Sequence, residues 1–355
     1  MNMKLNRRAI IGGITAGTLA FGLAACGGGG SDEEGGSGDL ASGEINASGA
    51  SFPDAFYAAA IEAYAEVNPD LMVSYNSTGS GTGKSEFGEG LNDFAGTDSL
   101  VGDDDGVEAG SFQYIPTVAA PITISYNLPG VDALQLPQDV LAGIFVGAIT
   151  TWNDAAIAEA NPDATLPDTA ITLAVRSDGS GTTTNFSKYL EASAPDVWTL
   201  GSGDTIEWPG NAVAGEKNTG VAQVIQDTEG AIGYVDLADA LEVGLVTASI
   251  ENADGAFVAP TLEGATAALD GAQVEADLSY NPLNAAGAEA YPITAPTYIL
   301  IRTEYEDANV AAGVKEFVNY LLTDGQALAA ENDYAALPTS LQEQALEALN
   351  STIAD

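Results

Sequence analysis

The sequence predicts an α/β protein with mainly parallel sheets, divided into two lobes. Short apolar strands alternate with amphipathic helices from about residue 45 to the end of the chain, a pattern typical of repeated β-α-β units. The roughly 310 residues that follow a polar N-terminal segment exceed the usual size of a single hydrophobic core. Because 46% of the residues are hydrophobic, the chain can fill two cores.

The N-terminus predicts export. Three basic residues precede an apolar run from Ala9 to Ala25, which is too short and too rich in Gly and Thr to span a bilayer comfortably. Small residues and then Cys26 end the run, as in a lipoprotein signal, so we expect removal of residues 1–25 and a lipid on Cys26. An ordinary signal peptide is the alternative, and the Arg7-Arg8 pair leaves twin-arginine export open. The expected location is outside the cytoplasm, anchored to the cell membrane by the lipid.

The next segment predicts a flexible tether. Residues 27–44, GGGGSDEEGGSGDLASGE, have almost nothing to bury. Lipidated Cys26 and this segment together form the predicted tether, 26–44. Cys26 is the only cysteine in the chain, so an intramolecular disulfide is excluded.

The first predicted helix begins near Ser51-Phe52-Pro53-Asp54 and ends at Asn68-Pro69. Serine near the cap, proline in the first turn and an early acid favour this start. Apolar residues at helical spacing predict one buried face: Phe56, Ala60, Ile61, Tyr64 and Val67.

The remaining elements continue the alternation, without a tandem repeat of fixed period. The apolar stretch 112–128 contains Pro116 and Pro121, so we expect one or two extended strands there. Further strands are predicted at 71–75, 93–97, 171–175, 231–235 and 297–302. Helices are predicted at 138–145, 153–160, from 182 through Leu190, at 221–226, 310–322 and 341–349.

The charge excludes one class of partner. Without its signal the chain carries 6 basic and 51 acidic residues, a net charge of −45. Nucleic acid is excluded because its phosphates need a basic surface. We interpret the carboxylates as a solubilising coat.

Two glycine-rich turns are the strongest sign of a binding site. The stretch STGSGTGKS, from Ser77 to Ser85, resembles a nucleotide-binding P-loop but has Thr78 where that motif needs its first glycine. The letters GSGT occur at 79–82 and again at 179–182, each time after a predicted strand and before a predicted helix. Backbone N–H groups at a helix start, aided by the helix dipole and by hydroxyls, favour an oxyanion. Chance similarity of glycine-rich segments is the alternative.

Several motifs in order carry a family resemblance. They are SGASFPDAF, YNSTGSGTG, DFAGTD, VRSDGSGTT and GAIGYVD, supported by LAGIFVGAITTWND, LGSGDTIEWPG and YPITAPTYILI. From about Gly43 to the C-terminus the chain resembles the phosphate-binding proteins of bacterial phosphate ABC importers. The resemblance implies a two-lobed periplasmic-binding-protein fold of the second type, with two crossover strands and a ligand cleft between the lobes. Lobe one would comprise 45–117 and 289–355, and lobe two 118–288.

The resemblance also implies a function. The protein would bind inorganic phosphate with high affinity outside the cytoplasm and deliver it to the importer by closing its two lobes around the anion. Its partners would be the membrane permease subunits and the cytoplasmic ATPase. No metal or organic cofactor is expected, the membrane would be contacted only through the lipid, and the protein would be a monomer.

Phosphate-contacting residues carry over by position. Ser51, through its hydroxyl and N–H, and Phe52, through its N–H, match donors at the first helix start, although capping and core packing are simpler roles for them. Ser80 matches the donor of the first turn. The second turn would contribute Ser180, Gly181 and Thr182.

Two further residues would complete the phosphate site. Arg176 matches the one cationic contact, able to meet two phosphate oxygens in a fork. Only Arg176 and Arg302 remain as arginines after signal removal. Asp178 would orient Arg176 by pairing with it, or would simply initiate the turn.

Asp98 is the residue expected to select the anion. A carboxylate accepts hydrogen bonds, and phosphate near neutral pH still carries a P–OH proton to donate. Fully ionised sulfate has no proton and would be repelled. The alternative is a turn aspartate after Gly96-Thr97.

Three other functions stay open at this point. An enzyme is disfavoured because the chain has no histidine and a single cysteine, which removes Ser-His-Asp catalysis and histidine-ligated metals. Acid-only hydrolysis is still conceivable. Another oxyanion, such as sulfate, molybdate or phosphonate, could be the ligand, and adhesion or sensing at the surface could be the main role.

Overall fold

A computed structural model describes residues 40–354. The predicted signal, Cys26 and most of the predicted tether lie outside the described residues. The tether prediction is wrong at its end, because strand β1 begins at Gly43 and pairs with β2. Among the described helices, none has the length and apolar character needed to span a membrane.

Eight strands follow one another across the main sheet in the order β2-β1-β3-β12-β4-β8-β6-β7. Two short strands, β9 and β13, pair with β4 beside this path, and β5, β10 and β11 form a separate small sheet. The bounds are β1 (Gly43–Gly49), β2 (Leu71–Ser77), β3 (Phe94–Thr97), β4 (Phe112–Tyr126), β5 (Gln135–Leu136), β6 (Thr172–Arg176), β7 (Ala212–Gly215), β8 (Ala231–Asp236), β9 (Val246–Thr247), β10 (Ser249–Glu251), β11 (Phe257–Val258), β12 (Thr294–Arg302) and β13 (Ala335–Ala336).

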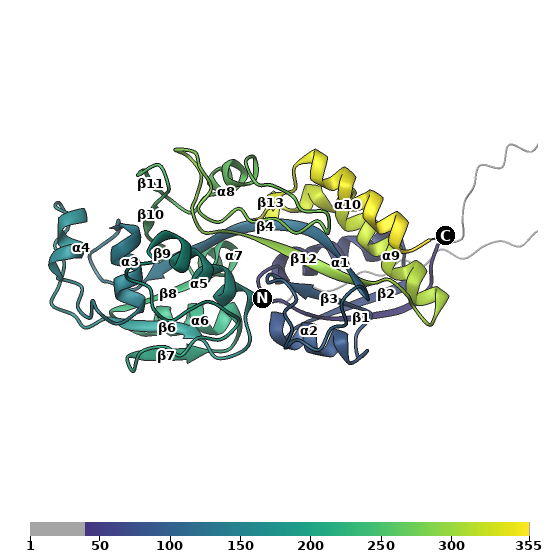
Figure 1. Cartoon of the computed structure of the whole chain (residues 1–355), viewed down its shortest axis with the longest axis horizontal. Helices are drawn as coiled ribbons and strands as arrows, with labels where there is room; N and C mark the ends of the chain where they lie inside the picture. The colour runs from purple at the N-terminus through teal and green to yellow at the C-terminus, as the bar shows by residue number, and fades with distance from the viewer. Residues whose placement is uncertain (1–39, 355) are drawn as a thin grey trace, which may run out of the picture. The chain divides into compact units, whose positions relative to one another are not determined.

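The sheet divides into two parallel parts joined by antiparallel strands. β1 is parallel to β2 and β3, and β6 is parallel to β7 and β8. We call the first group with its helices lobe one, and the second group with its helices lobe two. β4 connects them, because its first part pairs with β12 and its last five residues pair with β8 (Figure 1). The predicted two-lobed α/β fold is confirmed.

β4 settles the uncertainty about the stretch 112–128, which is one strand of 15 residues running through both prolines. Beside Pro116 the register with β12 shifts, so that Thr117 is skipped in the pairing. A bulge at this point accommodates a residue that cannot donate to the ladder.

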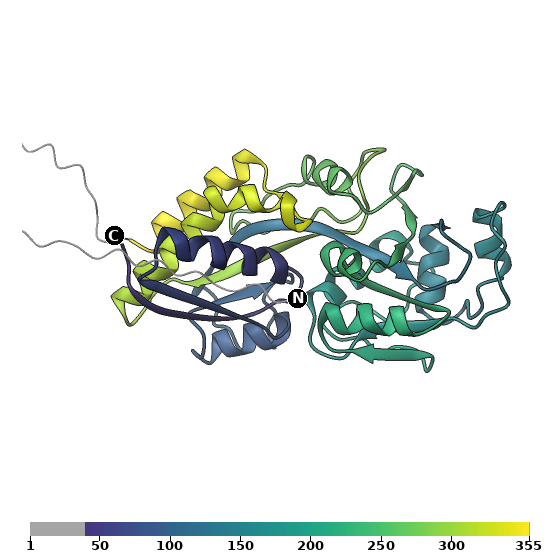
Figure 2. The ribbon, with the colours of Figure 1, turned by 180° about the vertical axis from the view of Figure 1, so that it is seen from behind.

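Ten α-helices occur among the described residues. In lobe one, α2 lies on one side of the β1–β3 strands and α1 and α9 lie on the other side (Figures 1 and 2). The bounds are α1 (Asp54–Val67), α2 (Ser80–Gly88), α3 (Gln138–Phe145), α4 (Ala155–Ala160), α5 (Gly181–Ser193), α6 (Lys217–Asp227), α7 (Leu237–Glu242), α8 (Leu262–Leu269), α9 (Ala308–Leu322) and α10 (Thr339–Thr352).

The observed first helix differs from the sequence prediction in three details. Pro53 stands at its N-cap and no side chain caps it, so Ser51 has no capping role. Val67, which was expected on the buried face, is exposed. Tyr57, which was not expected there, is buried. The helix ends at Asn68 as predicted.

Candidate functional site

Both glycine turns lead from a strand directly into a helix. α2 begins at Ser80, three residues after β2 ends, and α5 begins at Gly181 after β6. Gly79 precedes α2 with φ of 92°, a backbone conformation that side chains other than glycine rarely adopt. The first N–H groups of each helix have no partner within the helix, so both turns present donors and the positive end of a helix dipole.

The two turns meet across the boundary between the lobes. The N–H of Gly81 donates to the carbonyl oxygen of Gly179 at 3.1 Å. A Cβ atom added at Gly181 would lie 2.6 Å from Ser80 Oγ and 2.7 Å from Asp98 Cβ. Glycine is needed there because no side chain fits between the lobes.

Arg176 lies at the end of β6 and is held by three side chains. Its Nε donates to Asp178 Oδ1 at 2.9 Å, and its Nη2 forms an ion pair with Asp178 Oδ2. Its Nη1 donates to Asn218 Oδ1 at 3.4 Å, and its backbone N–H donates to the Tyr234 hydroxyl. The Arg176 side chain is only 2% exposed. The pairing expected of Asp178 is present.

Asp178 remains charged beside this arginine. Burial would raise the pKa of Asp178, but the hydrogen bonds and charge of Arg176, with the Lys217 N–H at 3.0 Å, outweigh burial and lower it. The carboxylate of Asp178 therefore holds the guanidinium of Arg176 in one orientation.

Asp98 follows β3 and is buried at 3% exposure. Its Oδ1 accepts from Thr297 Oγ1 at 2.7 Å, and its Oδ2 accepts from Ser80 Oγ at 3.3 Å. Burial raises the pKa of Asp98 to about 7, although Thr297, Arg176 and Ser80 each oppose this shift. The carboxyl group therefore keeps its proton at a higher pH than an ordinary aspartate does.

The start of α1 contributes Ser51 and Phe52. Ser51 Oγ accepts from the backbone N–H of Asn218 at 3.3 Å, a contact from lobe one to lobe two. The Phe52 ring is fully buried and packs edge-on against Tyr334, whose hydroxyl donates to the Phe52 carbonyl oxygen at 2.6 Å. The core-packing role considered for Phe52 is present.

The second turn places three site residues at the start of α5. Ser180 caps the helix, because its Oγ accepts from the N–H of Thr183 at 3.1 Å. Gly181 and Thr182 occupy the first helical positions and are buried. Thr182 Oγ1 accepts from Asn218 Nδ2 at 3.3 Å.

Asn218 is the main residue that the sequence analysis missed. It is fully buried at the start of α6 and contacts Ser51, Arg176 and Thr182. Its neighbour Lys217 has φ of 61°, which turns two successive N–H groups toward Asp178 and Ser51. Nothing in the local pattern EKNTG signals this role.

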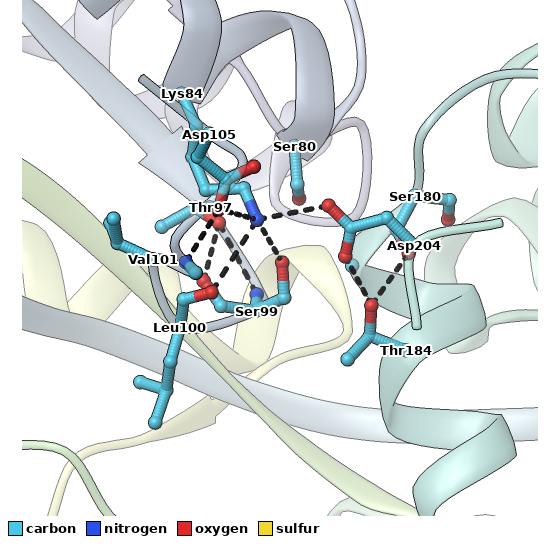
Figure 3. A network of polar contacts seen from close by, with 12 residues as sticks. Ser80, Lys84, Thr97, Ser99, Leu100, Val101, Asp105, Ser180, Thr184 and Asp204 are labelled. Atoms are coloured by element: carbon cyan, nitrogen blue, oxygen red, sulfur yellow. Dashed lines mark hydrogen bonds and ion pairs between the residues drawn. The ribbon is translucent and has the colours of Figure 1, made fainter. Parts of the chain in front are cut away.

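Two more contacts link the lobes near Asp98. Asn185 Nδ2 donates to the Asp98 carbonyl oxygen at 2.6 Å. Lys84, on α2, forms an ion pair with Asp204 of lobe two at 2.9 Å (Figure 3). The motif LGSGDTIEWPG contains Asp204 but does not indicate its partner.

An acidic cavity of about 460 Å³ adjoins the site at Ser51. Burial, and then the neighbouring Asp239, raise the pKa of Asp236, and burial raises that of Asp239. Asp54, at the start of α1, also lines the cavity.

No group of three or more metal-ligating side chains in the described part of the chain could hold a metal ion.

The arrangement suits a small oxyanion that carries a proton. It combines one fixed guanidinium, the starts of two helices and several hydroxyls, which are anion donors. It also contains Asp98, whose carboxylate can accept a hydrogen bond from the ligand only when the ligand carries a proton. The contacts above bring Ser51, Ser80, Asp98, Arg176, Asp178 and the second glycine turn together between the lobes. The contacts given for Phe52 are with Tyr334 inside lobe one.

The chain is similar to known proteins over most of its length. The profile described as a PBP superfamily domain matches residues 35–325. A phosphate-binding protein PstS of Xylella fastidiosa (strain 9a5c) is 38% identical over 277 residues, which cover 77% of this chain and 76% of that protein. PstS 3 of Mycobacterium tuberculosis (strain H37Rv) is 32% identical over 374 residues, covering 98% of this chain and 100% of that protein.

Solved structures share the fold. A phosphate-binding protein from Stenotrophomonas maltophilia aligns with a TM-score of 0.67 at 22% sequence identity, covering 86% of this chain and 94% of that one. This likeness confirms the predicted two-lobed periplasmic-binding-protein fold.

Proposed function

The chain belongs to the phosphate-binding proteins of ABC importers, within the PBP superfamily, and from this premise we propose that it captures inorganic phosphate outside the cytoplasm for such an importer. The anion would bind between the lobes, where the two glycine turns meet. The permease subunits and the ATPase of the importer would be its partners. Catalysis is not part of the proposal.

One observation carries the proposal, which is that Arg176 and Asp98 converge on the same place from different lobes. Burial raises the pKa of Asp98, and the nearby charge of Arg176 opposes part of this shift, while Asp178 fixes the guanidinium. A cationic fork opposite a hydrogen-bond acceptor matches an anion that has both charged oxygens and a P–OH group. Sulfate, which lacks the proton, would meet repulsion from Asp98.

The other proposed donors to the anion lie at the starts of three helices. Ser51 and Phe52 would donate from the start of α1, Ser80 from α2, and Ser180, Gly181 and Thr182 from α5. Charge-assisted hydrogen bonds contribute about 1.5–3 kcal/mol each, so a set of this size supports high affinity. Closure of lobe one (45–117 and 289–355) on lobe two (118–288) would trap the anion, and opening would release it.

Anchoring and assembly complete the proposal. The signal pattern supports a lipid on Cys26 and attachment to the cell membrane. The strong negative charge supports a soluble extracytoplasmic part that stays monomeric. Mass spectrometry of the membrane fraction would detect the lipid on Cys26, and an unmodified N-terminus would contradict it.

The test is calorimetric titration of the ligand-stripped chain with phosphate, arsenate and sulfate. We expect tight binding of phosphate and little heat with sulfate. Arg176→Lys should raise the Kd for phosphate about 100-fold, because a point charge replaces a two-pronged contact. Arg302→Lys is the matched control, since Arg302 binds the carbonyl oxygens of Phe87 and Asn92 instead. Equal binding of sulfate and phosphate, or no binding of either, would contradict the proposal.

A further inference from the structure

Lys84 does not have the role that its sequence context suggests. In STGSGTGKS it stands where a P-loop has its phosphate-binding lysine, yet its nitrogen contacts protein oxygens. Nζ lies 2.9 Å from Asp204 Oδ2, 3.0 Å from Asp105 Oδ2 and 3.0 Å from Ser99 Oγ (Figure 3). The Leu100 carbonyl oxygen accepts from the same nitrogen at 3.4 Å. An ammonium group has three N–H donors, so protein oxygens satisfy all of them.

The two carboxylates come from different lobes. Asp105 follows β3 and belongs to lobe one, as α2 does. Asp204 lies between α5 and β7 in lobe two. The pair of Lys84 with Asp105 is therefore independent of lobe position, whereas the pair with Asp204 requires the lobes to be together.

Asp204 is also connected to the second glycine turn. Its carbonyl oxygen accepts from the N–H of Ser180 at 3.0 Å, and its Oδ1 accepts from the Thr184 hydroxyl. Burial would raise the pKa of Asp204, but the charge of Lys84 and the Thr184 hydroxyl outweigh burial and lower it. An ionised Asp204 without Lys84 would be a partly buried carboxylate that has lost its cationic partner.

Lys84 is connected to the first glycine turn in the same way. It lies four residues after Ser80 on α2, about one helical turn along the same face. The Lys84 side chain is 2% exposed, so the surrounding atoms restrict its conformation. The ion pair with Asp204 thus joins the two helices whose first turns face each other.

We propose that Lys84 and Asp204 are positioning residues whose ion pair holds the lobes closed and sets the lifetime of the bound anion. This proposal rests on the function proposed above. A contact that exists in only one of two conformations shifts the equilibrium toward that conformation. Loss of the pair should therefore weaken binding mainly through faster dissociation.

Asp204→Asn removes the charge but keeps an oxygen for Thr184. We expect stopped-flow dissociation of phosphate to become about tenfold faster or more, with a matching rise in Kd. Asp105→Asn is the matched control, because it removes the other carboxylate partner of Lys84 within lobe one. It should leave the dissociation rate within about threefold of the wild type.

A double-mutant cycle separates the pair from general effects. Lys84→Met and Asp204→Asn should be non-additive, because each removes the same interaction. Additive effects, or equal acceleration by Asp204→Asn and Asp105→Asn, would overturn the proposal. Thermal unfolding of each variant shows that the measured chain is folded.

Small-angle X-ray scattering of the phosphate-free chain tests the ion pair without a ligand. The Asp204→Asn chain should have a larger radius of gyration than the Asp105→Asn chain, and equal radii would count against the ion pair. Failure of the wild-type chain to bind phosphate would contradict the proposed function, whereas the scattering comparison would still test the pair.

Discussion

The N–H of Gly81 donates to the carbonyl oxygen of Gly179 at 3.1 Å, so the two glycine turns touch in the closed arrangement. Each turn ends a strand of a different lobe and begins a helix. Any atom added between them therefore separates the lobes as well as the turns.

Gly181→Ala should weaken phosphate binding by about 100-fold. The new Cβ would lie 2.6 Å from Ser80 Oγ and 2.7 Å from Asp98 Cβ, so the lobes cannot close fully and the donors no longer converge. The measurement is calorimetric titration. Gly210→Ala is the control, because its Cβ meets nothing within 4 Å. Equal affinity in both variants would contradict the close approach.

Sulfate binding by the wild-type chain should strengthen as pH falls from 8.5 to 6. Burial raises the pKa of Asp98 to about 7, so below that pH the carboxyl group carries its own proton and can donate to sulfate. Above it, the carboxylate repels the anion, and the Kd should rise by up to about tenfold per pH unit.

Asp98→Asn provides the comparison for this experiment. An amide does not titrate and can donate at every pH, so the variant should bind sulfate with a nearly pH-independent Kd. Titrations with sulfate at four pH values would measure how the Kd depends on pH in both chains. A Kd that changes steeply with pH in the variant, or one that does not change in the wild type, would show that Asp98 does not select the anion.

Asp98 should also make the ligand-free chain less stable as pH rises. Its folded-state pKa of about 7 lies above the ordinary 3.8, so between these values the folded chain holds a proton that the unfolded chain has released. The free energy of unfolding should therefore fall as pH rises from about 4 to 7 and then level off.

Urea unfolding of wild type and Asp98→Asn from pH 4 to 8 measures this effect. The variant should gain about 2–4 kcal/mol relative to the wild type across that range. Asp103→Asn, at an exposed position, is the control for replacing an aspartate by asparagine. A constant difference between wild type and Asp98→Asn would contradict the raised pKa.

Phosphate should associate more slowly at low ionic strength. Without its signal the chain carries a net charge of −45, which repels an approaching anion. At 0.15 M salt the Debye length is about 8 Å, so the repulsion is mostly screened. We expect the stopped-flow association rate to rise about two- to fivefold between 20 and 300 mM salt. A rate that does not change with salt would contradict this prediction.

Local patterns predicted most of the elements. α3 spans Gln138–Phe145 as expected, and β8 differs from its prediction by one residue at its end. These segments have apolar periodicity and clear boundaries, which depend on neighbours in the chain. β1 was missed because Gly43 and Glu44 resemble the polar tether that precedes them.

Some residues of the candidate site could be predicted from the sequence and others could not. The turns at Ser80 and Ser180, and Arg176 after its strand, are visible in short motifs. Asn218 and Asp204 are not, because each acquires its role from a partner more than 30 residues away or in the other lobe.

The order of strands and helices, the export pattern, the acidity and the two glycine turns follow from the residues in their chain order, since each depends on near neighbours or on composition. The partner of Lys84, the bridging contacts of Asn218 and the raised pKa of Asp98 depend on how the lobes pack. Burial and charge pairing act between groups that are distant along the chain, so no local pattern encodes them.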